Sequence, residues 1–374
     1  MDFSAVEHAL EEAAQRGVFP GAVLLVSRQG ETLLERAVGS RALEPERIGM
    51  RPEVVFDLSS LTKPLATTLA FMLLVKEKRL ALDDRVTRFF HNFGVHGKTH
   101  VTFRHLLTHS SGLAAHRPYY KDVAALERRG RPNFVASREA KEWVFEQVHR
   151  EKLEAPPGTR AVYSDLGFML LGQVVETVSG QPLDRFCHKR IFGPLGLRAT
   201  SFIDLSQLRT KRLEPIAEMI APTQRCPWRK RVLCGEVDDE NAYSMGGVAG
   251  HAGLFGSARD VDALANHLKA IANGEPGLLT KDLVDQMWTL DASVPGSTRT
   301  LGWDSPSLQR SSAGTRMSRH TVGHLGFTGT SIWMDLERGV NVILLSNRVH
   351  PSRDNDKLGE FRPRIHDLVM EAVA

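Results

Sequence analysis

The feature that constrains the fold most is the position of the strand-like segments, which lie at the two ends of the chain. Residues 22–27 and 32–38 are rich in aliphatic and β-branched residues and flank a Gln29-Gly30 turn, which predicts a hairpin. Residues 331–347 contain two apolar runs around Glu337-Arg338-Gly339, which predicts a second hairpin. Most of the sequence between them has helical periodicity. The pattern therefore predicts an α/β fold, with an antiparallel sheet built from both chain termini, flanked by helices, and an inserted all-helical domain.

The expected domain boundaries follow from this pattern. Residues 1–62 and 291–374 should form the α/β domain, and residues 63–290 the mostly helical domain. Residues 205–245 carry few periodic signals and are expected to form an extended loop. Because ligand pockets are common where domains meet, the active site is expected at the junction of the two domains.

The composition argues against several classes of protein. Hydrophobic residues make up 42% and charged residues 25% of the 374 residues, which is ordinary for a globular domain. The net charge is +4, and the basic clusters at 128–131 and 229–231 are short, so a solvated surface is expected in preference to a nucleic-acid site. No apolar run has the length of a membrane span, and the first residues do not resemble a signal peptide. We therefore expect a cytoplasmic protein.

Cysteines, histidines and glycines give no sign of a disulfide framework, a metal site or a phosphate loop. There are three cysteines; Cys226 and Cys234 could pair, although nothing in the sequence requires it. Six histidines lie between His91 and His116, but no H-E-x-x-H motif or cysteine pair accompanies them. The glycines of residues 246–256 are expected to let the backbone pass close to the site. No metal or cofactor is expected.

A polar turn followed by a long apolar helix pattern covers residues 56–75, FDLSSLTKPLATTLAFMLLV. Ser60 and Lys63 are three residues apart, so on a helix both side chains lie on one face. An S-x-x-K pattern also arises by chance. A lysine at the position where a helix becomes apolar, however, indicates an interaction partner or a functional role for its charge. A hydroxyl beside an amine can be a serine nucleophile and its base. Lys63 would have to be neutral for this, and burial lowers a lysine pKa from its usual value of about 10.4.

A tyrosine is a second candidate for the base. Tyr163 stands in the polar triplet Tyr163-Ser164-Asp165 just before the apolar helix pattern at 167–178, which repeats the layout at Ser60. Tyr119 and Tyr120 lie in a polar stretch and Tyr243 in the expected loop, so these three are weaker candidates.

Three short motifs carry a resemblance to a known family. Ser60-x-x-Lys63, Tyr163-x-Asp165 and His324-Leu325-Gly326 resemble, in order and spacing, the motifs of the serine β-lactamase and penicillin-binding-protein-like family, class C branch. The resemblance covers nearly the whole chain and implies the β-lactamase/transpeptidase-like fold. The supporting stretches are LLTHSSGL (106–113), PPGT (156–159), YSDLGFMLLG (163–172), IFGPLGL (191–197) and GGVAGHAGLF (246–255).

The resemblance also implies a mechanism. Ser60 would attack an acyl carbonyl to form an acyl-enzyme, while Lys63 and Tyr163 move the proton. The backbone N–H groups of Ser60 and Phe327 would form the oxyanion hole. Tyr163 would then be the base that activates water. Substrate contacts are expected from Asp165, His324, Gly326 and His251, although His251 could instead cap a loop.

The chain departs from this family at two of the three motifs. The third motif is normally Lys-Thr-Gly, which helps to hold a substrate carboxylate, but here His324 and Leu325 replace the lysine and threonine. A cation is present there only if His324 is protonated. The second motif normally ends in asparagine, and a carboxylate at Asp165 would repel an acidic substrate or pair with Lys63. Both changes argue against efficient penicillin hydrolysis.

We therefore expect a serine hydrolase that acts on an ester or amide, an esterase or a peptidoglycan-fragment amidase or peptidase, and a weak β-lactamase at most. The phrases GEVDDENA (235–242) and SNRVHP (346–351) resemble a branch of peptidoglycan-fragment amidases, which has histidine where this chain has Asp238. The expected substrate is a small molecule or a peptidoglycan fragment. The alternative is a non-catalytic ligand-binding or scaffold protein of the same fold, but Ser60, Lys63 and Tyr163 are all retained.

Overall fold

The structure is a computed structural model that describes residues 1–210 and 216–374. The predicted extended loop at 205–245 was wrong for much of its length, since it contains two short helices and a small hairpin; residues 211–215 of it lie outside the described residues. Tertiary contacts order this segment where periodicity gave no signal. Its elements are α8 (Leu205–Arg209), β6 (Arg225–Cys226), β7 (Arg231–Val232) and α9 (Glu240–Ser244).

A six-stranded antiparallel sheet is built from both ends of the chain, as predicted. Its strand order is β3-β2-β1-β11-β10-β9, so the N-terminal and C-terminal hairpins meet at the centre, where Ala22 lies opposite Ser346. β9 is an edge strand. The strands are β1 (Gly21–Arg28), β2 (Glu31–Ala42), β3 (Ile48–Gly49), β9 (Thr321–Leu325), β10 (Ser331–Asp335) and β11 (Val340–Ser346).

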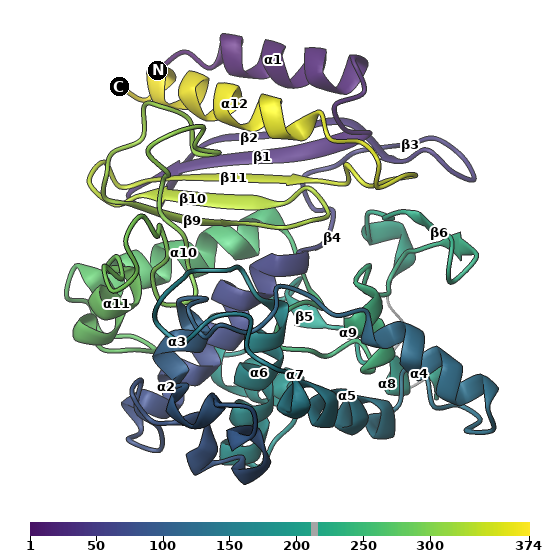
Figure 1. Ribbon diagram of the computed structural model, residues 1–374. Coiled ribbons are helices and arrows are strands. Elements are labelled where there is room, and N and C mark those ends of the chain that lie inside the picture. The colour runs from purple at the N-terminus through teal and green to yellow at the C-terminus, as the bar shows by residue number, and fades with distance from the viewer. Residues whose placement is uncertain (211–215) are drawn as a thin grey trace.

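Helices cover both faces of this sheet (Figure 1). On one face, α1 (Ser4–Gln15) and α12 (Leu358–Ala372) pack on Leu24 and Leu344. Alternate residues such as Val23 and Ile343 point to the other face, because strand side chains alternate. That face carries α10 (Ala258–Ala272), which packs on β1 and β11. The segment predicted to form the helical domain thus also supplies a helix to the sheet layers, and the predicted domain boundaries stay a prediction.

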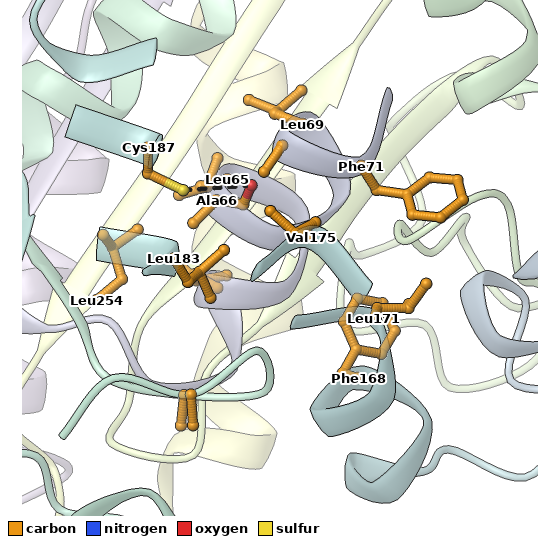
Figure 2. Packing of buried hydrophobic residues seen from close by; sticks show 14 of the residues in the cluster. Leu65, Ala66, Leu69, Phe71, Phe168, Leu171, Val175, Leu183, Cys187 and Leu254 are labelled. Carbon is orange, nitrogen blue, oxygen red and sulfur yellow. Dashed lines mark hydrogen bonds between the residues drawn. The ribbon is translucent and has the colours of Figure 1, made fainter. Parts of the chain in front are cut away.

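The helical region lies beyond α10 and surrounds the segment that starts at Ser59 (Figure 1). Figure 2 shows Leu65, Leu69, Phe168 and Val175 as members of one buried cluster. The helices are α2 (Leu69–Lys76), α3 (Phe103–Leu107), α4 (Tyr119–Arg128), α5 (Arg138–Arg150), α6 (Asp165–Ser179), α7 (Leu183–Cys187) and α11 (Lys281–Trp288). A small sheet of β4 (Phe56–Asp57), β8 (Leu254–Gly256) and β5 (Ser201–Phe202) joins this region to the start of the Ser59 segment.

Two further predictions concern cysteines and membranes. All three cysteines are free, so Cys226 and Cys234 are not paired. Over residues 1–210 and 216–374, no helix combines the length and apolar character that a membrane crossing needs. The cytoplasmic location stays a prediction.

Candidate active site

The segment that carries Ser60 and Lys63 is helical from its first turn, but only its later part is an α-helix. Residues Ser59–Leu61 form a 3-10 turn, Lys63–Thr68 a wider π-helix, and α2 follows directly. Ser59 has a left-handed φ of 49°, and the Asp57 carboxylate accepts its N–H at 2.8 Å. This tight entry turn places Ser60 at the mouth of a buried helix, as predicted.

Lys63 is completely buried and uses its ammonium group for three contacts. Its Nζ lies 3.1 Å from Ser60 Oγ, 2.8 Å from Asp165 Oδ1 and 3.0 Å from the His251 carbonyl oxygen. Burial alone would lower the pKa of Lys63, but the Asp165 carboxylate outweighs it and the pKa lies above the ordinary lysine value. The sequence pointed to burial as the influence on Lys63; burial does act in that direction, but the carboxylate keeps the lysine charged in the resting state.

Tyr163 lies next to the Ser60–Lys63 pair. Lys63 Nζ lies 4.8 Å from the centre of its ring, and the centre of the His109 ring lies 4.5 Å from the same point. Its hydroxyl is buried and has no hydrogen bond of good geometry to the described residues. Burial raises the pKa of Tyr163, and the nearby Lys63 charge only partly opposes this. The three predicted catalytic side chains are thus brought together, with the phenol protonated.

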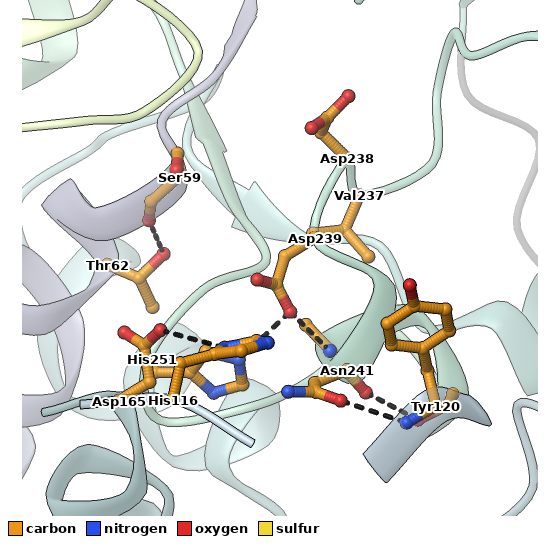
Figure 3. Close-up of polar contacts among 12 residues, drawn as sticks. Ser59, Thr62, His116, Tyr120, Asp165, Val237, Asp238, Asp239, Asn241 and His251 are labelled. Atoms are coloured by element: carbon orange, nitrogen blue, oxygen red, sulfur yellow. Dashed lines mark hydrogen bonds and ion pairs between the residues drawn. The ribbon is translucent and has the colours of Figure 1, made fainter. Parts of the chain in front are cut away.

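Asp165 begins α6 and pairs with Lys63, one of the two roles that the sequence allowed. Burial would raise the pKa of its carboxyl group, but Lys63 more than compensates, and the pKa lies below the usual range. Its second oxygen lies 3.7 Å from Nδ1 of His116, which sequence reasoning did not single out (Figure 3). The carboxylate thus connects the buried lysine with a half-exposed histidine.

His324 and Gly326 lie at the end of β9, beside Tyr163. His324 Nδ1 lies 2.8 Å from the Leu325 carbonyl oxygen, which can only accept, so this nitrogen carries the proton. Burial, together with the Lys63 and Arg299 charges, lowers the pKa of His324 well below the usual value, so the ring is neutral. The cation of a Lys-Thr-Gly motif is therefore absent here. A Cβ at Gly326 would lie 2.1 Å from Thr330 Oγ1 and 2.7 Å from the Leu58 carbonyl oxygen, which explains the glycine.

The predicted oxyanion donors differ in their surroundings. The Ser60 N–H has no acceptor in the described part of the chain. The Phe327 N–H donates to Ser59 Oγ at 3.2 Å. A substrate carbonyl would have to replace this hydroxyl before Phe327 could stabilise an oxyanion.

His251 contacts Lys63 and is not among the residues that line the cavity beside Ser60. Its side chain is 1% exposed, and its Nε2 lies 3.0 Å from Asp239 Oδ1 (Figure 3). Its carbonyl oxygen accepts from Lys63. These contacts favour the loop-holding role over the substrate contact, the two alternatives that the sequence left open.

A cavity of about 370 Å³ opens beside Ser60 and Tyr163. Three arginines line it: Arg299, Arg348 and Arg362. Arg299 pairs with Asp304 at 3.1 Å, whereas no carboxylate of residues 1–210 or 216–374 pairs with Arg348 or Arg362. Arg362 is 7% exposed, and burial lowers its pKa to about 10, so it stays charged at neutral pH.

Sequence reasoning missed these arginines, although one signal was present. Phe361, Arg362 and Ile365 all lie on the buried face of α12, so Arg362 occupies an apolar position of the helical pattern. Arg299 and Arg348 lie in segments without periodicity and left no comparable signal. In the described residues, no three His, Cys, Asp or Glu side chains are arranged to hold a metal ion.

Comparison with known proteins shows similarity to one family over nearly the whole chain. The family model described as Beta-lactamase matches residues 6–364. The chain is 32% identical over 361 residues to a putative D-alanyl-D-alanine carboxypeptidase of Escherichia coli strain K12, covering 91% of this chain and 81% of the relative. It is also 32% identical over 369 residues to an N-acetylmuramyl-L-alanine amidase of Bacillus subtilis strain 168, covering 92% of this chain and 80% of that protein.

Solved structures share the fold at lower identity. EstCE1, a hydrolase with promiscuous acyltransferase activity, superposes with a TM-score of 0.73 at 24% identity, covering 98% of this chain and 97% of that one. The octameric penicillin-binding protein homologue from Pyrococcus abyssi has the same TM-score at 23% identity and covers 99% of this chain and 78% of its own. With the family match and the relatives above, these similarities show that the chain belongs to the Beta-lactamase family of serine hydrolases, in its class C-like part.

Proposed function

We propose that the chain hydrolyses an ester or amide through an acyl-enzyme on Ser60, with Lys63 and Tyr163 as the proton-transfer groups. The observation that carries the proposal is the 3.1 Å contact between Ser60 Oγ and Lys63 Nζ beside a cavity that Ser60 and Tyr163 both line. A hydroxyl within hydrogen-bond reach of a potential base is the usual arrangement of an activated serine nucleophile.

The first chemical step forms the acyl-enzyme. Ser60 Oγ attacks the acyl carbon, its proton passes to Lys63 once the lysine is neutral, and the leaving group takes a proton from the Lys63–Tyr163 pair. The carbonyl oxygen becomes negative and is stabilised by the N–H groups of Ser60 and Phe327, the latter after it leaves Ser59 Oγ. A lost oxyanion donor typically slows turnover by about 100- to 1,000-fold.

The second step releases the acyl group to water. Tyr163 is the proposed base, since its hydroxyl is the polar group beside Ser60 that Lys63 can assist through its charge. Its protonated resting state means that Lys63 must accept the phenol proton or stabilise the phenolate as water attacks.

For the substrate class we propose a carboxylate-bearing ester or amide, such as a peptidoglycan fragment. Arg348 and Arg362 supply the positive charge in the cavity that the neutral His324 lacks. Arg299 adds a guanidinium group whose charge is shared with Asp304, which also lines the cavity. Guanidinium groups bind carboxylates well because their donors match the geometry of two oxygens. The names of the E. coli and B. subtilis relatives refer to a peptidase and an amidase of this chemical kind.

The test compares four substrates with wild type and with Ser60→Ala. The substrates are a muropeptide amide, a D-alanyl-D-alanine peptide, a neutral aryl ester and a cephalosporin. We expect a Ser60-dependent reaction with the carboxylate-bearing amide or peptide and with the aryl ester, and slow cephalosporin turnover. Unchanged hydrolysis by a folded Ser60→Ala variant would overturn the proposal. Ligand binding without acylation in the wild type would favour the non-catalytic alternative.

A further inference from the structure

The buried lysine must lose a proton before it can accept one from Ser60. Lys63 Nζ has three partners: the Ser60 hydroxyl, the His251 carbonyl oxygen and the Asp165 carboxylate. A backbone carbonyl does not take up a proton, and Ser60 is the group to be deprotonated. Of the three partners, only Asp165 can receive the ammonium proton.

The Asp165 carboxylate also contacts a group that reaches solvent. Its Oδ1 bonds to Lys63 and its Oδ2 lies 3.7 Å from His116 Nδ1. The side chains are 0% exposed for Lys63, 19% for Asp165 and 49% for His116. Figure 3 shows His116 directed at the carboxylate and His251 paired separately with Asp239. The contacts of Lys63, Asp165 and His116 therefore connect the buried ammonium group with the solvent.

Resting on the proposed function, we propose that His116 is the outlet through which the Lys63 proton leaves the site, by way of the Asp165 carboxylate. Lys63–NH₃⁺ gives a proton to Asp165–COO⁻, leaving Lys63–NH₂ and Asp165–COOH. The protonated carboxyl group then turns its O–H from Lys63 toward His116, and the 3.7 Å separation closes to hydrogen-bond distance. Nδ1 of neutral His116 takes the proton, and the imidazolium ion formed releases a proton to water. No bond other than N–H and O–H changes, and Asp165 returns to its charged state.

The charges around His116 suit this role. Asp165 faces it from the start of α6, and Asp239 and Glu240 face it from the start of α9. The neighbouring Arg117 is engaged with Glu151 at 3.2 Å and Glu154 at 3.0 Å. The interaction with Asp165 raises the pKa of His116 above the usual value, although partial burial opposes it. The ring therefore exchanges protons with water close to neutral pH.

The charge of His116 also acts on Lys63. When His116 is protonated, its positive charge partly compensates the Asp165 carboxylate, so the carboxylate stabilises the Lys63 ammonium group less. With an uncharged residue at position 116, the carboxylate acts on Lys63 at full strength. Removing the histidine should therefore make Lys63 harder to deprotonate at low pH, and at high pH it removes the neutral imidazole that accepts the proton from Asp165. His116 acts through Asp165 and does not touch the reacting atoms.

The test measures the acylation rate from pH 5 to 10 with an activated aryl ester in a stopped-flow burst. The variants are His116→Gln, His116→Ala and, as a matched control, the exposed His91→Gln. We expect His116→Gln to slow acylation about tenfold at pH 9, where the neutral imidazole accepts the proton in the wild type and Lys63 is still charged, and His91→Gln to follow the wild type. Added imidazole should restore at least half of the lost rate in His116→Ala, which a purely structural role would not allow.

A His116→Gln profile that superposes on the wild type, or a fall that is equal at all pH values and insensitive to imidazole, would overturn the inference. Either result would leave the proposed function intact as long as acylation still requires Ser60. Acylation that persists in Ser60→Ala would instead remove the proposed function itself.

Discussion

The carboxylate of Asp165 lies 2.8 Å from the ammonium group of Lys63, at the position where the class C motif resembled by this chain has asparagine. The pair holds Lys63 in place, but it also holds its proton, since the pKa of Lys63 is raised above the ordinary value. The site thus has the three groups of an acylating serine hydrolase, with the lysine charged at rest.

Replacing this carboxylate by an amide should increase the fraction of Lys63 that is neutral. Asp165→Asn keeps the size and a hydrogen-bond acceptor but removes the charge, so the pKa of Lys63 should fall. We expect the acid limb of the acylation rate to move to lower pH by about 1 to 3 units, and the maximal rate to fall because an amide cannot pass the Lys63 proton to His116. Stopped-flow acylation across pH measures this shift. If the acid limb of the variant lies at the same pH as that of the wild type, Asp165 does not set the protonation state of Lys63.

The arginines of the cavity should discriminate substrates by charge. Arg299→Gln should lower kcat/KM about tenfold, equivalent to about 1.4 kcal/mol, for a carboxylate-bearing substrate. The same variant should leave a neutral aryl ester within twofold, because no carboxylate is bound. Arg150→Gln, at an exposed position of α5, is the matched control. Equal losses for charged and neutral substrates would contradict a carboxylate-binding role.

Gly326 should tolerate no side chain. The Cβ of Gly326→Ala would lie 2.1 Å from Thr330 Oγ1 and 2.7 Å from the Leu58 carbonyl oxygen. We expect a loss of about 1 to 3 kcal/mol in the free energy of unfolding, measured by urea denaturation, together with reduced acylation because Phe327 follows directly. Gly359→Ala, where no atom lies within 4 Å, should cause no loss. A fully stable and active Gly326→Ala would show that the strand end has room to move.

His366 should make folding sensitive to acid. Burial lowers its pKa to about 4, and its Nδ1 lies 2.8 Å from the Ser312 carbonyl oxygen. The unfolded chain binds a proton near pH 6.5 and the folded one does not, so stability is lost as the pH falls below that value. From pH 7 to 5 this residue should account for a loss of about 2 kcal/mol.

Urea unfolding of the wild type and His366→Asn at both pH values tests this, because the acid-induced loss should be about 2 kcal/mol smaller in the variant. An identical loss in both proteins would mean that His366 is protonated in the folded state.

Local patterns were enough to predict the two hairpins of the sheet. Alternating apolar residues and turn pairs such as Gln29-Gly30 are encoded within a few residues, so both hairpins were correct. The meeting of Ser60, Lys63 and Tyr163 was expected because their motifs resemble those of a known family, and the geometry agrees.

What the sequence did not reveal depends on contacts between distant segments. Ser59 and Phe327 are 268 residues apart, and their hydrogen bond exists only because β9 ends beside the nucleophile turn. The charge of Lys63 depends on its 2.8 Å distance from Asp165, and burial alone suggested the opposite. His116 lies in a segment without periodicity, so nothing local connected it with Asp165.

The most direct measurement is mass spectrometry of the intact protein after a short exposure to an aryl ester or a fluorophosphonate, followed by peptide mapping. The account predicts one adduct, on the peptide that contains Ser60, and none in Ser60→Ala with unchanged circular dichroism. An adduct on another residue, or the same labelling in Ser60→Ala, would contradict it.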